Sequence, residues 1–281
     1  MARRFGLVCI AAGVLTLWPT VATAQVTIGS DLGLNSRYMF WGLTLSNKPV
    51  IQPDVWISVA GFTGGVWGNF EVSKQTGPND YTSGGSRNGL TEVDYWLEYA
   101  RSAGPADLKV GAIRWTYSLK NTGTLGPCVP DCGIPNNGPD INSTEVYGAV
   151  TFSKLPLSPN ITAYYDVDLY KGLFGWVSLS HSIPVATKSL NLVALMGICA
   201  SMSNTGADQI PLYTNHGITH YDFSAAVPLT VGPIAVNPNA HFQVNVVVDN
   251  KQTSATQLNG KTVFTFGATL SWSHPLGKAS E

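Results

Sequence analysis

Three carboxylates recur on one face of the stretch TEVDYWLEYA, residues 91–100. Side chains alternate between the two faces of a β-strand, so Glu92, Asp94 and Glu98 share a face with Trp96. The opposite face carries Val, Leu and two Tyr side chains. Closely spaced carboxylates attract cations, and isolated charges are costly to bury away from water. The stretch therefore predicts a strand whose acidic face meets enclosed or bulk water and whose other face is apolar.

Acidic residues outnumber basic ones when the polar faces of all the predicted strands are gathered. The acidic candidates are Asp31, Glu71, Glu92, Asp94, Glu98, Glu145, Asp166, Asp168 and Asp222. The basic or titratable candidates are Arg37, Lys109, His220 and His241. An acidic wall concentrates cations and repels anions. We therefore expect these pore-lining candidates to give cation preference if they enclose an open path.

Catalytic and metal-binding alternatives have weaker support. His220 and Asp222 lie two residues apart on one predicted strand face, with His241 on a neighbouring strand, and a base beside an acid is a requirement of nucleophilic catalysis. Such spacing arises easily in polar-faced strands, and no G-x-S-x-G, H-E-x-x-H, P-loop or dinucleotide motif is present. Asp166 and Asp168 offer too few oxygen ligands for a Ca²⁺ loop. We predict no enzyme, no cofactor and no metal, with an outer-membrane enzyme as the minor alternative.

The beginning of the chain predicts export. Arg3 and Arg4 precede an apolar run at 5–18, and Ala22-Thr23-Ala24 offers a cleavage site. We expect residues 1–24 to be a removed secretory signal and residues 25–281 to form a single domain. In an exported chain, Cys128 and Cys132 are disulfide candidates because they lie four apart in a Gly/Pro/Asn-rich segment. Cys199 is expected to be a buried free thiol.

Composition excludes two classes of protein. Removal of Arg3 and Arg4 from the 16 basic residues leaves 14 against 17 acidic ones, which gives no reason to propose nucleic acid as a partner. No later segment reaches 18 consecutive apolar residues, so a helical membrane protein is not expected. Only 12% of residues are charged, which is about half the share in ordinary soluble domains.

Alternating apolar and polar residues predict an all-β chain. We expect twelve strands, at 26–41, 50–60, 63–72, 91–101, 106–117, 143–153, 160–168, 172–183, 189–201, 217–228, 235–249 and 261–273. Connections of about 8–25 residues alternate with connections of about 2–6 residues, except for the short one after Asp168, as expected when long loops face outward and short turns face the periplasm.

Two kinds of barrel fit this alternation, because a soluble barrel hides its apolar face whereas a membrane barrel shows it to lipid. The polar faces contain mostly Asn, Ser, Thr and Gly rather than Lys and Glu, and aromatics such as Phe264 and Trp272 stand near strand ends. Backbone groups in lipid must all be paired, so the sheet must close. We predict a closed antiparallel up-and-down transmembrane β-barrel of about 12 strands in the bacterial outer membrane. A soluble periplasmic ligand-binding barrel is the alternative.

Residues 36–70 also carry a family resemblance. The pattern consists of Ser36, Tyr38 and Gly42, then Ser46, Lys48 and Pro49, then the strand G-F-x-x-G-V-W-G at 61–68. It resembles the start of the bacterial Gcw_chp family of TorF-type porins, and segments 92–99 and 145–150 look like that family's acidic-aromatic strands. Trp41 departs from the family pattern, in which an Arg is expected. The resemblance implies a porin-like outer-membrane barrel without a known substrate.

These observations together predict a narrow, cation-preferring pore or uptake channel for small solutes or ions. Its other partners would be outer-membrane lipid and the barrel-assembly machinery. An occluded barrel with a structural or adhesive role is the alternative, because eight strands leave an interior filled by side chains whereas 16–18 leave a channel. Several aromatic side chains are expected to point inward, namely Trp56, Trp67, Trp96, Tyr147 and Tyr164.

Overall fold

A computed structural model of the chain describes residues 25–73, 89–117, 142–200, 213, 216–246 and 262–277. The expected signal segment 1–24 and the disulfide candidates Cys128 and Cys132 lie outside these residues. Within the described ranges, no helix is long and apolar enough to cross a membrane.

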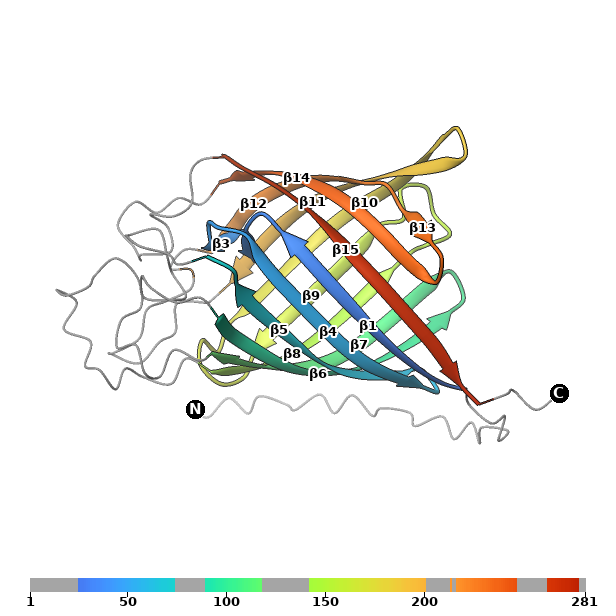
Figure 1. Cartoon of the computed structure of the whole chain (residues 1–281). Coiled ribbons are helices and arrows are strands. Elements are labelled where there is room, and N and C mark those ends of the chain that lie inside the picture. Colours follow the sequence, from blue (N-terminus) through green and yellow to red (C-terminus); the bar gives the residue numbers. More distant parts are fainter. Residues whose placement is uncertain are drawn as a thin grey trace, which may run out of the picture.

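Twelve antiparallel strands of the described chain form a closed barrel (Figure 1). They are β1 (Val26–Asn35), β4 (Val50–Val59), β5 (Phe62–Glu71), β6 (Gly89–Ala103), β7 (Ala106–Tyr117), β8 (Ser143–Thr151), β9 (Asn160–Asp166), β10 (Leu173–Val185), β11 (Lys188–Ala200), β12 (Gly217–Ala226), β14 (Ile234–Asn245) and β15 (Thr262–Leu276). Each strand pairs with its neighbour in the chain, and pairing of β1 with β15 closes the sheet. The short β13 (Leu229–Val231) pairs with the start of β14. The predicted closed barrel is confirmed.

The first predicted strand, at 26–41, is wrong in its second half. β1 ends at Asn35, and β2 (Tyr38–Phe40) and β3 (Leu43–Ser46) form a separate two-stranded hairpin. The reversal occurs at Trp41 and Gly42, whose φ angles are 49° and 89°. Left-handed backbone of this kind breaks a strand, so these residues cannot continue the wall.

Connection lengths alternate along most of the barrel, in agreement with the sequence pattern, and the exception is again the short connection after β9 (167–172). Two residues join β4 to β5 (60–61), β6 to β7 (104–105) and β10 to β11 (186–187). Ala60 and Gly61 both have positive φ, which fits the twist of a tight hairpin. The start of β1 and the end of β15 lie at this same end of the barrel (Figure 1).

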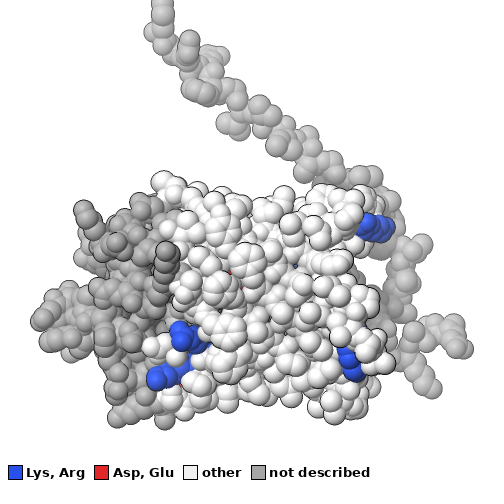
Figure 2. Space-filling model, turned by 90° about the horizontal axis from the view of Figure 1, so that it is seen from above, with Lys and Arg blue, Asp and Glu red and all other residues white. Residues whose placement is uncertain are grey.

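The outer face of the barrel is apolar. The most exposed large side chains include Leu97, Val110 and Phe266, with 57%, 59% and 61% of their surface accessible. Figure 2 shows Lys and Arg side chains only toward the two ends of the barrel in this view, with a broad uncharged band between them. A barrel of this kind presents to its surroundings the residues that a water-soluble protein would bury.

The inner face is polar and buried. Side chains with almost no accessible surface include Asn69, Glu71, Thr91, Glu92, Asp94, Ser143, Glu145, Thr162, Asp166, His220 and Gln243. The acidic face of the 91–100 stretch therefore lies inside the barrel, while Tyr95 and Leu97 point outward. Cys199 is buried and forms no disulfide within the described part of the chain, as predicted.

A ladder of amide side chains crosses the inner wall near the hairpin. Asn35 Nδ2 donates to Gln52 Oε1 at 2.8 Å, and Gln52 Nε2 donates to Asn69 Oδ1 at 3.0 Å. Asn69 Nδ2 in turn donates to Thr91 Oγ1 at 2.8 Å. The ladder links β1, β4, β5 and β6, and it satisfies polar groups that would be costly to enclose without partners.

Candidate functional site

The β2–β3 hairpin, residues 38–46, folds into the barrel lumen. The four residues Leu43–Ser46 are each no more than 2% exposed. In a barrel whose outer face is apolar and exposed, such burial on both faces of a short strand requires contact with the inner wall. The contacts of the hairpin show where it sits.

Trp41 forms the centre of an aromatic cluster at the tip of the hairpin. Its ring stacks on Phe40 and on Phe174 of β10, each with a centroid distance of 4.5 Å. It also contacts Tyr164 of β9 at 5.8 Å, and Phe40 meets Trp115 of β7 edge-on at 4.9 Å. Aromatic contacts of these geometries each contribute about 0.5–1.5 kcal/mol beyond burial, so the tip is held against three strands of the wall.

Hydrogen bonds also attach the tip to β14 and to Tyr213, which lies between β11 and β12 in the chain. Gln243 Nε2 of β14 donates to the Gly42 carbonyl at 2.6 Å, and the Tyr213 hydroxyl donates to the Trp41 carbonyl at 2.6 Å. Burial raises the pKa of Tyr213, which keeps this hydroxyl a neutral donor. A Cβ on Gly42 would lie 2.4 Å from His220 Nδ1 of β12, so only glycine fits at this point. The hairpin therefore leaves the wall between β1 and β4 and reaches across the lumen to β7, β9, β10, β12 and β14.

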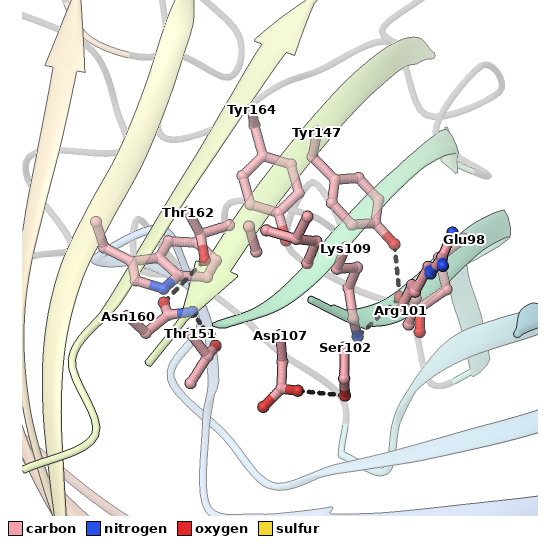
Figure 3. Close-up of a pocket in the computed structure, with 14 residues that line it drawn as sticks. Glu98, Arg101, Ser102, Asp107, Lys109, Tyr147, Thr151, Asn160, Thr162 and Tyr164 are labelled. Atoms are coloured by element: carbon pink, nitrogen blue, oxygen red, sulfur yellow. Dashed lines mark hydrogen bonds and ion pairs between the residues drawn. The ribbon is translucent and has the colours of Figure 1, made fainter. Parts of the chain in front are cut away.

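A cavity of about 460 Å³ lies against the hairpin inside the barrel. Its lining is aromatic and acidic, and includes Tyr38, Phe40, Trp41, Asp54, Trp67, Asp94, Trp96, Glu98, Lys109, Trp115, Tyr147 and Tyr164. A second cavity of about 610 Å³ is lined by β6–β10 toward the end with the short turns (Figure 3). Glu98, Lys109, Tyr147 and Tyr164 line both cavities, so the two spaces meet at these side chains.

The junction between the cavities is a charged cluster, visible in Figure 3. Lys109 Nζ lies 2.9 Å from Glu98 Oε2, and the Tyr147 hydroxyl donates to the same carboxylate oxygen at 2.9 Å. Tyr147 also stacks on Tyr164, with a centroid distance of 5.0 Å. The ion pair therefore lies where the two cavities adjoin.

Glycines on the wall allow large rings to lie along it instead of filling the lumen. In four directly paired cross-strand positions, a ring covers a glycine of the neighbouring strand: Gly29 and Trp56, Gly65 and Trp96, Gly111 and Tyr147, and Gly197 and His220. A Cβ on Gly65 would lie 2.7 Å from the Trp96 ring. The expectation that inward aromatics fill the interior therefore misses this arrangement, in which the rings lie flat.

The other acidic candidates have different surroundings. Asp166 accepts the backbone N–H groups of Asp168, Tyr170 and Lys171 at 3.0, 2.9 and 3.2 Å, so it holds the β9–β10 connection in place. Glu145 pairs directly with Asp166 in the β8–β9 ladder. Asp168 forms an ion pair with Arg114, and both side chains are partly exposed.

The histidine candidates fall into two separate groups. His241 Nδ1 lies 3.0 Å from Asp222 Oδ1 on the β12–β14 side of the lumen. His220 instead contacts the hairpin at Gly42 and lies parallel to Phe174 at 6.5 Å. Arg37 is half-buried just before the hairpin. Among the described residues, no group of three or more His, Cys, Asp or Glu side chains could hold a metal ion.

Sequence reasoning missed the hairpin and Asp54. Asp54 accepts a hydrogen bond from Trp96 Nε1 at 3.3 Å and lines the cavity of about 460 Å³. The alternating pattern of β4 could have identified Asp54, because its neighbours Pro53 and Val55 belong to the opposite face of the strand. The Trp41-Gly42 pair, which favours a turn, was the corresponding signal for the hairpin.

Comparison with known proteins gives similarity only at the level of solved structures. No family model and no curated protein matches the chain. The COG4313 outer membrane channel from Pseudomonas putida F1 is 10% identical, with 89% of this chain and 95% of that chain covered and a TM-score of 0.46. The CymD monoaromatic hydrocarbon channel is 9% identical, with coverage of 91% and 90% and a TM-score of 0.41. OmpF of Salmonella typhi in complex with daunomycin is 7% identical, with coverage of 89% and 97% and a TM-score of 0.37. Membership of the TorF-type porin family is not confirmed.

Proposed function

We propose that this chain is an outer-membrane channel that admits small solutes through a lumen narrowed by the β2–β3 hairpin. The observation that carries the proposal is the pair of adjoining cavities, of about 460 and 610 Å³, inside a closed barrel. Charged, polar and aromatic side chains line them, which suits the passage of small polar solutes. Lipid, the barrel-assembly machinery and small solutes or ions are its proposed partners.

The apolar outer face supports the membrane location. Strands of 7 to 15 residues are long enough on average for tilted membrane strands, which need ~9–11. The exposed side chains of β6 and β7 include Tyr95, Leu97 and Val110. An exposed apolar surface of this extent is costly in water and favourable in lipid.

The Leu97→Arg variant tests this location. Leu97 is the ninth of fifteen residues in β6 and points outward, so a charge there would lie near the middle of the bilayer. We expect a loss of folding free energy of about 2–4 kcal/mol in lipid vesicles, measured by urea titration of heat-modifiable gel mobility. Leu155→Arg, in the connection between β8 and β9, is the matched control and should cost less than about 1 kcal/mol. Equal small costs at both sites would contradict a membrane-spanning barrel.

We also propose that the channel prefers cations. Of the described side chains that line the cavity of about 460 Å³, Asp54, Asp94 and Glu98 are acidic and Lys109 is basic. Glu71, Glu92, Glu145 and Asp166 are further acidic side chains buried on the same inner wall. A narrow lumen of low dielectric strengthens the effect of such charges on passing ions.

An occluded barrel is the second candidate, favoured by the contacts of the hairpin with both sides of the lumen. It predicts that the wild-type protein passes no ions until the hairpin is removed. The conductance of the wild-type protein therefore separates the two candidates directly.

Substitution at Gly65 tests whether flat rings keep the lumen open. Gly65→Val would push the Trp96 ring from the wall into the cavity, because a Cβ there meets the ring at 2.7 Å. We expect single-channel conductance to fall by at least about twofold. Gly68→Val is the control, since its Cβ would make ordinary contact with Leu90 at 3.4 Å. If both variants conduct like the wild type, the position of the ring does not limit the flow.

A further inference from the structure

Aromatic rings surround the cavity of about 460 Å³ on several sides. Phe40 and Trp41 reach it from the hairpin, while Trp67, Trp96 and Trp115 reach it from β5, β6 and β7. Trp96 has one face against Gly65, which leaves its opposite face toward the lumen. The face of an aromatic ring carries negative potential and attracts a cation placed within about 6 Å of its centroid.

Carboxylates stand among these rings. Trp96 Nε1 donates to Asp54 Oδ1 at 3.3 Å, which fixes a carboxylate at the edge of the ring. Asp94 and Glu98 line the same space, and the ammonium group of Lys109 is already paired with Glu98. A positively charged guest placed among such groups would stabilise their ionised form.

The combination selects a chemical class of ligand. A bare metal ion needs six or more oxygen ligands if it is Ca²⁺, and rings supply none. An anion would meet the carboxyl groups, and a neutral solute would gain nothing from their charge. A volume of about 460 Å³ lies within the range of about 300–1,000 Å³ typical of small-molecule sites.

We propose that this cavity is a binding site for a small organic cation, such as a quaternary ammonium or a protonated amine. The inference deepens the proposed function and rests on it, because the solute would reach the cavity through the channel. The open face of Trp96 holds the alkyl groups of the cation, and the carboxylates of Asp54 and Asp94 balance its charge. The ion pair of Glu98 and Lys109 marks the exit toward the larger cavity.

Calorimetric titration of the full chain in detergent tests the site. The two probes are choline and 3,3-dimethylbutan-1-ol, which has the same shape without the charge. We expect choline to bind at least about tenfold more tightly than the neutral alcohol, because only the cation gains from the rings and carboxylates. Equal affinity for the two probes, or no binding of choline, would overturn the proposal.

Two matched pairs of variants locate the binding. Trp96→Leu should weaken choline binding by about tenfold, whereas Trp56→Leu should not change it. Trp56 has the same arrangement, with its ring over Gly29 and its Nε1 donating to Asp31 at 2.9 Å, but it does not line the cavity. Asp54→Asn should also weaken binding, whereas Asp222→Asn should not. Equal effects within either pair would place choline elsewhere and overturn the proposal.

Bilayer recordings on the same preparation distinguish failure of the cation site from failure of the proposed channel. Ion conductance without choline binding would contradict the cation site and leave the channel in place. Choline binding without conductance would support the site and contradict the proposed channel. Heat-modifiable gel mobility verifies that each variant is folded before either measurement.

Discussion

Replacement of residues 36–49 by a two-residue Asn-Gly turn is expected to raise single-channel conductance by about threefold or more, because a barrel of twelve strands has room for water once its interior is cleared. Asn35 and Val50 are direct partners in the β1–β4 ladder, so a two-residue turn can join them without change of register. The replacement removes Trp41 together with its stacking contacts to Phe40 and Phe174. It also frees Gln243 and Tyr213 from the hairpin backbone.

The measurement is single-channel recording of purified wild-type and variant protein in planar bilayers. The control shortens the exposed connection at 153–158, which joins β8 to β9 at the other end of the barrel. That change should leave conductance the same, because the connection lies outside the lumen. Trp41→Ala should give an intermediate conductance, since it loosens the tip and keeps the backbone of the hairpin. If the hairpin replacement conducts no better than the control, the hairpin is not the constriction.

Substitutions of the two partners of the ion pair at the junction of the cavities should change ion preference in opposite directions. Glu98→Gln leaves the Lys109 ammonium without its carboxylate, 2.9 Å away in the wild type, so the permeability ratio of K⁺ to Cl⁻ should fall by severalfold. Lys109→Met removes the ammonium and leaves the carboxylate, so the ratio should rise. Both side chains line both cavities, which is why a single charge at this point has a large effect.

Reversal potentials under a KCl gradient measure these ratios. Asp222→Asn is the control, because Asp222 pairs with His241 and lines neither cavity. It should change the ratio little. If Glu98→Gln and Lys109→Met change the permeability ratio in the same direction, the charges of these two side chains do not set selectivity. A shift as large in Asp222→Asn would show that the path lies on the other side of the lumen.

The wall of the barrel was predictable because its signals are local. Alternation with period two gives the strand and its faces, and strands that follow one another in the chain pair with one another here. The predicted bounds of β7, at 106–117, match the structure. The apolar face of β6, with Tyr95 and Leu97, was identified as outward because the alternative would put carboxylates into lipid.

The hairpin was not predictable from the same signal. Residues 38–46 are as apolar as a wall strand, so alternation cannot tell a segment buried inside the lumen from one that faces lipid. Only the positive φ at Trp41 and Gly42 and the contacts with distant strands decide the matter. Contacts such as Gln243 with Gly42 join residues about two hundred positions apart, and no local pattern encodes them.

The site was predictable as a set of residue types and not as an arrangement. Glu98, Lys109 and Tyr147 were each expected to point inward, yet their meeting depends on the register of β6, β7 and β8. Register follows from turn geometry and packing, and neither can be derived from the alternation of residue types in a single strand. Asp166 was also expected to face the lumen, but its carboxylate accepts backbone N–H groups of the β9–β10 connection.

Single-channel recording of the wild-type protein in a KCl gradient tests whether the barrel is an open, cation-preferring channel. We predict a small, resolvable conductance with a reversal potential that shows preference for K⁺ over Cl⁻. The same recording with the hairpin replacement should give larger steps. Absence of current in the wild type, with large currents in the hairpin replacement, would contradict the channel and establish an occluded barrel.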